Sequence, residues 1–328
     1  MKAIVIHEPG GPEKLILEER PIPQVRDGWS RIQVKGFGVN HSEIFTRKGL
    51  SPGVEFPRVL GIECVGIVDA TTDPERLPKG QKVISIMGEM GRAFDGGYEE
   101  YVLLPNAQIY PVETSLPWEI LAAVPETYYT AFGSYRNLRI GEEDSVLVRG
   151  ATSGVGIAFA RLVKAAFPKL RLTGTSRSRE KEAALLAAGF DQVILDHEGV
   201  LQTEQKFTKV LELIGPATLK DTFAHVSEGG IVCSTGQLGG VWNLDFEPIM
   251  ELPPNGYLTS FYSGNVSSEK LNRMLRFIEE HQVNAAPEKV FPLEQTAEAH
   301  RYLESRDSFG KVVVSITANL KCDFGLAE

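Results

Sequence analysis

A stretch near the middle of the chain, residues 145–156 (SVLVRGATSGVG), combines residue types that bind phosphate groups. Its apolar start is followed by Ser153, Gly154, Val155 and Gly156, which lead into an apolar-periodic segment typical of a helix. Glycines let backbone N–H groups approach a pyrophosphate closely, and a helix N-terminus offers unpaired donors and a partial positive charge. A strand, glycines and a helix in this order predict a dinucleotide-binding site, with a merely structural turn as the alternative.

Three residues at the end of the next predicted strand decide between the two nicotinamide dinucleotides. Ser176, Arg177 and Lys181 supply a hydroxyl and two cations there, and no Asp or Glu occupies the strand end. A 2′-phosphate favours such groups, whereas a free ribose hydroxyl favours a carboxylate. Cations are unfavourable at a helix N-terminus unless an anion lies beside them, which argues against an ordinary solvated helix start. The sequence therefore predicts NADP(H) as the cofactor.

The elements that position these residues fall into two kinds. The first third of the chain has short strands separated by turns, which predicts a partly open β-barrel. From about residue 122, strands and helices alternate, as in a doubly wound parallel sheet of an α/β protein. The apolar strand predicted at residues 311–316 is expected to return to the barrel. We therefore expect a catalytic domain of residues 1–122 and 262–328 and a dinucleotide-binding domain of residues 123–261.

Composition and charge exclude several classes of function. The chain has 328 residues, 42% of them hydrophobic, and a formal net charge of −9. An acidic protein repels nucleic acid and anionic membrane surfaces, so neither is an expected partner. No apolar run is long enough to cross a bilayer and no targeting segment is recognised, so a cytoplasmic protein is expected. The isolated Cys64, Cys233 and Cys322 indicate neither a zinc lobe nor disulfides.

Several motifs in order carry a resemblance that covers nearly the whole chain. They are Met1-Lys2-Ala3, Gly38-Val39-Asn40, Leu60-Gly61-Ile62-Glu63, Gly97-Tyr98-Glu99-Glu100-Tyr101, Tyr129-Thr130-Ala131, Gly150-Ala151-Thr152-Ser153-Gly154-Val155-Gly156, Phe291-Pro292-Leu293, Ala297-Glu298-Ala299-His300 and Phe309-Gly310-Lys311-Val312-Val313. The chain resembles the medium-chain dehydrogenase/reductase superfamily and, within it, the zinc-independent quinone oxidoreductases related to zeta-crystallin. The resemblance implies a GroES-like catalytic domain and a Rossmann domain.

The resemblance also implies that the catalytic zinc site is absent. Alcohol dehydrogenases of the superfamily have a cysteine ligand where this chain has Asn40 and a histidine ligand where it has Ile62. An amide and an alkyl side chain cannot replace a thiolate and an imidazole, so no metal ligands are predicted. His41, which is beside Asn40, lacks partners at ligand spacing and is interpreted as a wall or loop residue.

Without a Lewis acid, conjugated acceptors are the favoured substrates. Hydride can add to an enone or a quinone, provided that hydrogen-bond donors hold the resulting anion. The resemblance places Asn40 near the nicotinamide, and we expect its amide to be that donor. Thr130 is expected beside the carboxamide or ribose, although a threonine in a helix often bonds its own backbone instead.

Two positions depart from the family's pattern. Relatives often carry tyrosines where this chain has Phe45 and Ser51. A phenol acid at either place is therefore excluded, and Tyr128 or Tyr129 is left as an unproven substitute.

The resemblance also implies several further cofactor contacts. These expected cofactor contacts are His197, Leu213, Gly236, Gln237 and Lys311. Trp242 and Phe261 are interpreted either as the substrate mouth or as core between domains. Relatives often dimerise by joining their sheets edge to edge, and residues 256–262, from Gly256 to Tyr262, are the candidate edge strand for a homodimer.

The sequence as a whole predicts an NADPH-dependent reductase of quinones or α,β-unsaturated carbonyl compounds. An enoyl-thioester reductase is the closest alternative among enzymes, and a long acyl pocket or a cationic coenzyme A site would favour it. A non-catalytic NADPH-binding structural or regulatory protein is the alternative from another class, and the Phe45 and Ser51 departures keep it open.

Overall fold

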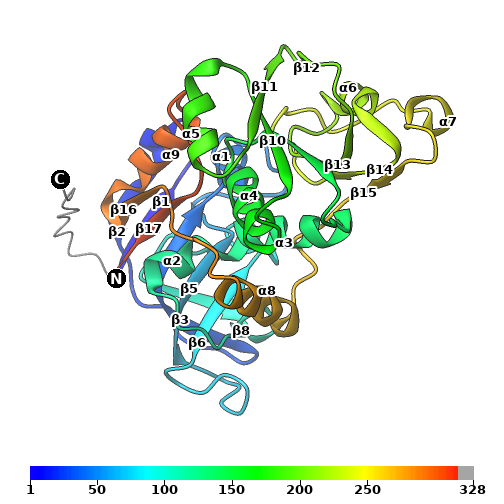
Figure 1. Ribbon diagram of the computed structural model, residues 1–328. Helices are drawn as coiled ribbons and strands as arrows, with labels where there is room; N and C mark the ends of the chain where they lie inside the picture. The colour runs from blue at the N-terminus through cyan, green and yellow to red at the C-terminus, as the bar shows by residue number, and fades with distance from the viewer. Residues whose placement is uncertain (317–328) are drawn as a thin grey trace, which may run out of the picture. The chain divides into compact units, whose positions relative to one another are not determined.

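The chain folds into two compact units. The computed structural model describes residues 1–316. Unit 1 consists of Met1–Pro125, Ala286–Asp307 and the strand that begins at Val312, and unit 2 consists of Glu126–Ala285 and Ser308–Lys311. The chain therefore leaves unit 1, completes most of unit 2, and then passes between them again near its end. Figure 1 labels the elements of both units.

Unit 1 is built mainly from short antiparallel strands. Its strands are β1 (Lys2–Ile6), β2 (Ile16–Glu19), β3 (Trp29–Val39), β4 (Arg58–Val59), β5 (Glu63–Ala70), β6 (Lys82–Ile86), β7 (Tyr101–Pro105), β8 (Tyr110–Pro111), β16 (Lys289–Pro292) and β17 (Val312–Ser315). They form a small sheet of order β2-β1-β4 and a larger one of order β16-β17-β3-β5-β6-β8, in which β7 also pairs with β3. Its α-helices are α1 (His41–Arg47), α2 (Trp118–Ala122) and α9 (Thr296–Glu304).

The last strand confirms the expected return of the chain to the barrel. β17 pairs antiparallel with β3, with Val312 opposite Val39 and Val314 opposite Phe37. All four residues of β17 are buried, as expected for an apolar strand that joins a sheet between other strands. Residues from opposite ends of the sequence therefore share one core.

Unit 2 contains a seven-stranded sheet. Its strands are β9 (Ser145–Arg149), β10 (Arg171–Ser176), β11 (Gln192–His197), β12 (Val200–Leu201), β13 (Phe207–Glu212), β14 (Val226–Ser234) and β15 (Tyr257–Thr259), and its α-helices are α3 (Pro125–Leu138), α4 (Gly154–Ala166), α5 (Glu182–Ala187), α6 (Leu219–Ala224), α7 (Pro248–Glu251) and α8 (Ser268–Glu280). The order is β12-β11-β10-β9-β13-β14-β15, and all neighbours are parallel except β12 (Figure 1). The predicted doubly wound sheet is confirmed.

The strand order places the glycine-rich turn at a special point of this sheet. From β9 the chain builds outward through β10 and β11, and it then returns to place β13 on the other side of β9. Ligands of doubly wound sheets bind where the strand order reverses, beyond the carboxyl ends of the strands. The turn after β9 lies at that position.

The division into units differs from the expected domain boundary at residues 261 and 262. Residues 262–285 belong to unit 2, and so do Ser308–Lys311. Aromatic packing explains the first difference, because Phe277 of α8 lies 5.3 Å from Phe132 of α3 between ring centroids and 5.6 Å from Tyr135. The sequence shows the period of α8 but not the surface that its apolar side covers.

A buried arginine, Arg149 at the end of β9, supports the glycine-rich turn that follows it. The Arg149 side chain is 0% exposed and forms ion pairs of 2.8 Å with both Asp196 and Asp221. It also donates to the Thr218 carbonyl and to the Thr222 hydroxyl. Opposite charges and saturated donors are what make a buried guanidinium tolerable. Arg149 thereby connects the end of β9 to β11 and α6.

The described chain contains no helix that combines the length and apolarity needed to cross a membrane.

Candidate cofactor and active site

The turn between β9 and α4 has the geometry that its glycines suggest. Ser153 is the N-cap of α4, and its Oγ accepts from the Gly156 N–H at 3.1 Å while donating to the Gly150 carbonyl at 2.8 Å. Gly150 has a φ of +83°, which disfavours any residue with a Cβ. A Cβ at Gly156 would lie 2.6 Å from the Ala151 carbonyl oxygen. The backbone is therefore packed so closely here that only glycine fits.

The residues expected to select NADP(H) lie at the end of β10. Thr175 ties β10 to the turn, because its Oγ1 accepts from the Gly150 N–H at 3.1 Å. Ser176 is buried and Arg177 is exposed beside it. Within residues 1–316, Arg177 has no carboxylate at ion-pair distance, whereas Arg179 contacts Glu182 at 3.5 Å. An exposed cation without a carboxylate partner is available to an anionic ligand.

A segment distant in sequence brings two more of the expected residues to this turn. The Gly310 N–H donates to the Thr152 carbonyl at 3.0 Å, and Ser153 forms a β-bridge with Gly310. Lys311, the next residue, is buried. The Lys181 ammonium donates to the Ser308 carbonyl in a short hydrogen bond. The structure thus gathers Lys181, Ser153 and Lys311 around one short segment.

The remaining expected cofactor contacts lie at other strand ends of the same sheet. His197 is exposed at the end of β11, and Leu213 is buried directly after β13. Gly236 lies so close to β13 that a Cβ would be 2.2 Å from the Leu213 carbonyl oxygen, and Gln237 beside it is exposed. Gly236 therefore permits the close approach expected from its place in the sequence.

The hydroxyl of Thr130 bonds a side chain and not its own backbone. Thr130 Oγ1 donates to Glu126 Oε1 at 3.1 Å, and Ser263 donates to the same oxygen at 3.0 Å. Ser134, one turn further along α3, is 3.0 Å from Thr235 at the end of β14. Glu126 was missed by the sequence analysis, although its spacing of four residues from Thr130 is a signal for a contact on a helix.

The two candidate phenol groups are hydrogen-bonded to backbone carbonyls. Tyr129 donates to Asn265 at 2.7 Å, and Tyr128 donates to Asn284 at 3.0 Å. Both rings are buried, and that of Tyr129 packs edge-on against Phe261 with centroids 5.5 Å apart. Both hydroxyl protons are therefore donated to carbonyls within unit 2. These contacts do not indicate that either tyrosine acts as a proton donor to a substrate.

Asn40 of unit 1 lies between two buried carboxylates. Its Nδ2 donates to Glu63 Oε1 at 2.8 Å and, with a longer distance of 3.4 Å, to Glu43 Oε1. Glu43 Oε1 also accepts from the Ile62 N–H at 3.1 Å. A carboxylate only accepts hydrogen bonds, so the amide nitrogen, and not the oxygen, faces this pair. The sequence analysis named Asn40 and Ile62 but missed the role of Glu43 and Glu63.

The described residues meet neither the requirements of a metal site nor those of a reactive cysteine. Residues 1–316 contain no group of three or more His, Cys, Asp or Glu side chains that could hold a metal ion. Cys64 and Cys233 are buried, and burial raises the pKa of both thiols above the ordinary value. A raised pKa keeps a thiol protonated and unreactive. Cys322 lies outside the described residues.

Comparisons with known proteins agree with this architecture. The family model described as "Alcohol dehydrogenase GroES-like domain" matches residues 26–114, and the one described as "Zinc-binding dehydrogenase" matches residues 188–314. The mouse protein named "Quinone oxidoreductase" is 27% identical over 340 residues, covering 96% of this chain and 97% of its own.

Two solved structures have the same fold. The Bacillus subtilis protein yhfP with NAD bound has a TM-score of 0.83 and 22% identity, covering 96% of this chain and 99% of its own. The yhdH oxidoreductase from Salmonella enterica in complex with NADP has a TM-score of 0.82 and 19% identity, covering 96% and 100%. The fold is therefore that of the alcohol dehydrogenases and related oxidoreductases. The chain belongs to the medium-chain dehydrogenase/reductase superfamily, an oxidoreductase family, and within it to the zinc-independent quinone oxidoreductase type.

Proposed function

We propose that the chain is an NADPH-dependent, zinc-independent reductase that transfers hydride to quinones or α,β-unsaturated carbonyl compounds. The observation that carries this proposal is the convergence of the glycine turn, Arg177 and Lys311 at the point where the strand order of unit 2 reverses. Similarity to the mouse quinone oxidoreductase supports the acceptor class. A nicotinamide cofactor, when bound, supplies the hydride.

The residues around the turn fit a phosphorylated dinucleotide. Gly156 and Gly236 have no room for a Cβ, so the backbone is preserved where a pyrophosphate would approach. Arg177 and Lys181 are cations at the strand end where a 2′-phosphate would lie, and Ser176 adds a hydroxyl. Gln237, His197, Leu213 and Thr130 remain proposed contacts with the rest of the cofactor.

The cofactor preference is tested by replacing Arg177 with Asp. An aspartate would repel a 2′-phosphate and accept from a free ribose hydroxyl. We expect Arg177→Asp to raise the KM for NADPH by about tenfold or more, since a charge-assisted contact contributes roughly 1.5–3 kcal/mol, and to change that for NADH much less. Equal effects on the two cofactors would refute the assignment. Arg179→Asp, which removes a nearby cation that already contacts Glu182, is the matched control.

The hydrogen bonds of Asn40 favour a role different from the donor expected at first. Its amide nitrogen already donates to Glu63 and Glu43, which makes the nitrogen a poor donor to an oxyanion. The amide oxygen points away from carboxylates by the same geometry, and polarisation by the charged acceptors makes it a better acceptor. We therefore propose that the amide oxygen of Asn40 accepts a hydrogen bond during the reaction and so orients the group that donates it.

Conjugated acceptors suit this site because it lacks zinc-ligand residue types. Asn40 and Ile62 cannot bind zinc as a thiolate and an imidazole do, so polarisation of an isolated ketone has no evident source among these residues. An enone or quinone delocalises the added charge and needs less help. This argument selects a class of acceptors and not one compound.

A substrate panel followed by the loss of NADPH absorbance tests the function. It should include quinones, alkenals, alkenones and enoyl thioesters, with Asn40→Ala as the site control. We expect turnover of a quinone or an alkenone, lowered at least tenfold by Asn40→Ala. Turnover of enoyl thioesters alone would contradict the proposed acceptor class and identify an enoyl-thioester reductase. Tight NADPH binding without turnover of any compound would contradict the proposed reductase activity and favour a non-catalytic NADPH-binding protein.

We also propose that the chain forms a homodimer through the edge of the unit 2 sheet. β15 is the last strand of that sheet and presents an edge that pairs readily with another strand. Large apolar side chains on or just after this strand are exposed, among them Tyr257 (58%), Leu258 (40%) and Tyr262 (73%). An exposed apolar patch of this kind is typical of an interface. Sedimentation velocity tests the proposal, and a monomer throughout the micromolar range would contradict it.

A further inference from the structure

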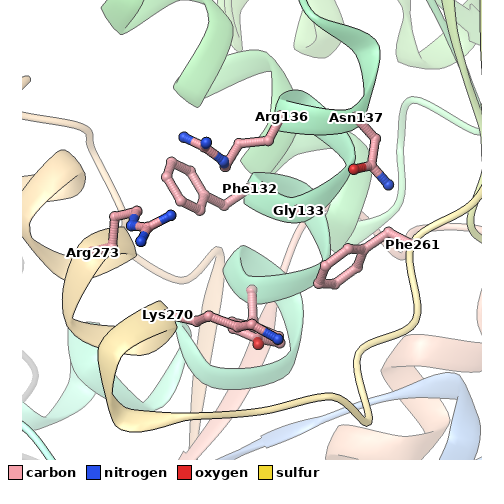
Figure 2. Close-up of a pocket in the computed structure, with 8 residues that line it drawn as sticks. Phe132, Gly133, Arg136, Asn137, Phe261, Lys270 and Arg273 are labelled. Atoms are coloured by element: carbon pink, nitrogen blue, oxygen red, sulfur yellow. The ribbon is translucent and has the colours of Figure 1, made fainter.

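A pocket lies in unit 2, between α3 and α8. Its volume is about 160 Å³. Phe132 and Gly133 of α3 and Phe261 form its apolar part, and Arg136 of α3 with Lys270 and Arg273 of α8 forms its charged part. Figure 2 shows the side chains of Arg136 and Arg273 extending toward the Phe132 ring from two different helices. Three cations and three aromatic rings, those of Tyr129, Phe132 and Phe261, therefore meet in one small space.

The pocket lies on a side of α3 that adjoins the side of the residues assigned to the cofactor. Of its lining residues on α3, Tyr129, Phe132, Gly133 and Arg136 share one face of the helix by their spacing, and Asn137 lies at the border of that face. Thr130 and Ser134 lie on another face, where Ser134 contacts Thr235 at the end of β14. Neither Thr130 nor any of the glycine-turn residues lines the pocket, although Tyr129, the candidate proton donor, does.

The charges around the pocket are poorly balanced. Arg136 has no ion pair within residues 1–316, and Lys270 donates to the Asn265 carbonyl at 2.9 Å. Arg273 pairs with Glu269 at 2.6 Å, but Glu269 is 76% exposed, and such surface pairs are weak. The chain as a whole carries a net charge of −9. Two of the three cations therefore have no carboxylate at ion-pair distance within residues 1–316 and the third has only a surface one, so the pocket favours an anion.

The apolar part of the pocket is rigid and fits a ring. A Cβ at Gly133 would lie 2.1 Å from the Phe261 ring, so Phe261 rests directly on the backbone of α3. Phe132 is buried and is held by Phe277 at 5.3 Å. An apolar cavity of about 150 Å³ in another protein accommodates benzene, which sets the size of the group that fits here.

We propose that this pocket binds a small organic anion that carries a carboxylate on an apolar six-membered ring, at a site separate from that of the cofactor. Arg136 and Arg273 offer planar guanidinium groups that match a carboxylate, and Lys270 adds a third donor. Phe132 and Phe261 cover the ring. The inference does not depend on the proposed reductase activity, because Arg136, Lys270 and Arg273 have no role in the proposed cofactor site.

Benzoate is the probe for this proposal, with the full-length chain studied by isothermal titration calorimetry. We expect saturable binding with a Kd on the order of 1 mM or tighter, as is usual for a ligand of this size in a preformed pocket. Benzamide has the ring without the charge and acetate has the charge without the ring, so both should bind at least tenfold more weakly. Equal binding of benzamide, or no saturable binding of benzoate, would overturn the proposal.

Variants locate the binding. Arg136→Gln and Lys270→Gln should each weaken benzoate binding about tenfold. Arg136→Lys should weaken it less, because a lysine keeps the positive charge. Arg276→Gln, on α8 but outside the pocket lining, should leave it unchanged. Saturating NADPH should not displace benzoate. Displacement by NADPH, or equal weakening by Arg276→Gln, would overturn the assignment to this pocket, and an unchanged melting temperature of each variant would show that folding is not the cause.

Discussion

Asn40 illustrates how a residue's partners decide what its side chain can do. An asparagine amide has two donors and one acceptor, and the structure directs Nδ2 toward Glu63 at 2.8 Å and Glu43 at 3.4 Å. Both carboxyl groups are buried, so neither is screened by solvent. The bond to Glu63 is within the usual range for N–H···O, and the bond to Glu43 is longer and weaker. Glu63 therefore fixes which end of the amide is presented.

The orientation of Asn40 leads to a prediction for Glu63→Gln. A glutamine can donate as well as accept, so it removes the charge that fixes the amide and permits the amide to rotate. If Asn40 acts through its oxygen, we expect kcat to fall about tenfold, equivalent to about 1.4 kcal/mol, with the KM for NADPH nearly unchanged. Steady-state kinetics with NADPH and the acceptor found in the panel would measure both constants.

A matched control distinguishes this positioning role from a general loss of charge. Glu119→Gln removes an exposed carboxyl group elsewhere in unit 1 and should change neither constant. If Glu63→Gln raised kcat, Asn40 would act through its nitrogen, as the sequence first indicated. Circular dichroism melting of both variants would separate a kinetic effect from loss of the fold.

At the scale of elements, two glycines of one turn are required for different reasons. A Cβ on Gly156 would lie 2.6 Å from the Ala151 carbonyl oxygen, which is a backbone atom that cannot move aside. A Cβ on Gly154 would meet its nearest neighbour, the Gly310 carbonyl oxygen, at 3.4 Å, which is an ordinary contact. Packing between strand and helix therefore explains Gly156. Gly154 has no comparable steric reason within unit 2, which leaves close approach of a ligand as its function.

The two alanine variants should therefore separate folding from binding. Gly156→Ala is expected to destabilise the chain by about 1–3 kcal/mol, because the helix start must shift. Gly154→Ala should change the free energy of unfolding by less than about 1 kcal/mol but weaken NADPH binding about tenfold. Urea unfolding and NADPH fluorescence titration measure the two effects. Unchanged NADPH affinity of Gly154→Ala would contradict a pyrophosphate at this helix N-terminus.

The sequence predicts elements of this protein better than it predicts their partners. The order of strand, glycine turn and helix is local, and the return of β17 to β3 follows from an apolar strand that needs a sheet. The packing of α8 on α3 through Phe277 and Phe132 is not local, and this is why the expected boundary at residue 261 differs from the division at residue 285.

In the candidate site, too, the sequence indicates individual residues but not the partners of their side chains. Residue types and the resemblance point to Asn40 and Thr130, but their acceptors, Glu63 and Glu126, emerge only from the folded chain. Arg149 looks like the polar end of an apolar strand in the sequence. Its burial makes sense only after Asp196 and Asp221, which are 47 and 72 residues away, arrive beside it.

At the scale of the molecule, a polar cluster within unit 1 joins its N-terminal and C-terminal segments. Arg47 of α1 pairs with Glu304 of α9 at 2.6 Å, although 257 residues separate them. Tyr98 is hydrogen-bonded to His300 Nε2 at 3.0 Å and stacks on Phe37 with centroids 4.5 Å apart. α9 is therefore anchored by polar contacts inside a largely apolar core, and the free energy of those contacts depends on ionisation.

The whole chain should lose stability in mild acid because of His300. Burial, and secondarily the positive charge of Arg47, lower the pKa of His300 from 6.5 to about 3, while Glu304 acts in the opposite direction. The unfolded chain binds this proton below pH 6.5 and the native chain does not. The stabilisation is thus fully present above pH 6.5 and is lost as the pH falls toward 3, by up to about 1.4 kcal/mol per pH unit.

Replacement of His300 by Gln isolates this contribution, because Gln cannot take up a proton in that range. The variant lacks some native packing and should be less stable near pH 7, but its free energy of unfolding should fall less steeply than that of the natural chain between about pH 6 and about pH 4. Glu99, whose pKa is raised by burial, gives an opposite slope that is common to both proteins and cancels in their difference. Urea unfolding across this range measures the two slopes, with the exposed His7→Gln as the control.

Parallel slopes for the natural chain and His300→Gln would contradict this prediction, because they would mean that His300 is protonated in the native state. The polar cluster around α9 would then have to rearrange in acid to accommodate the charge of His300.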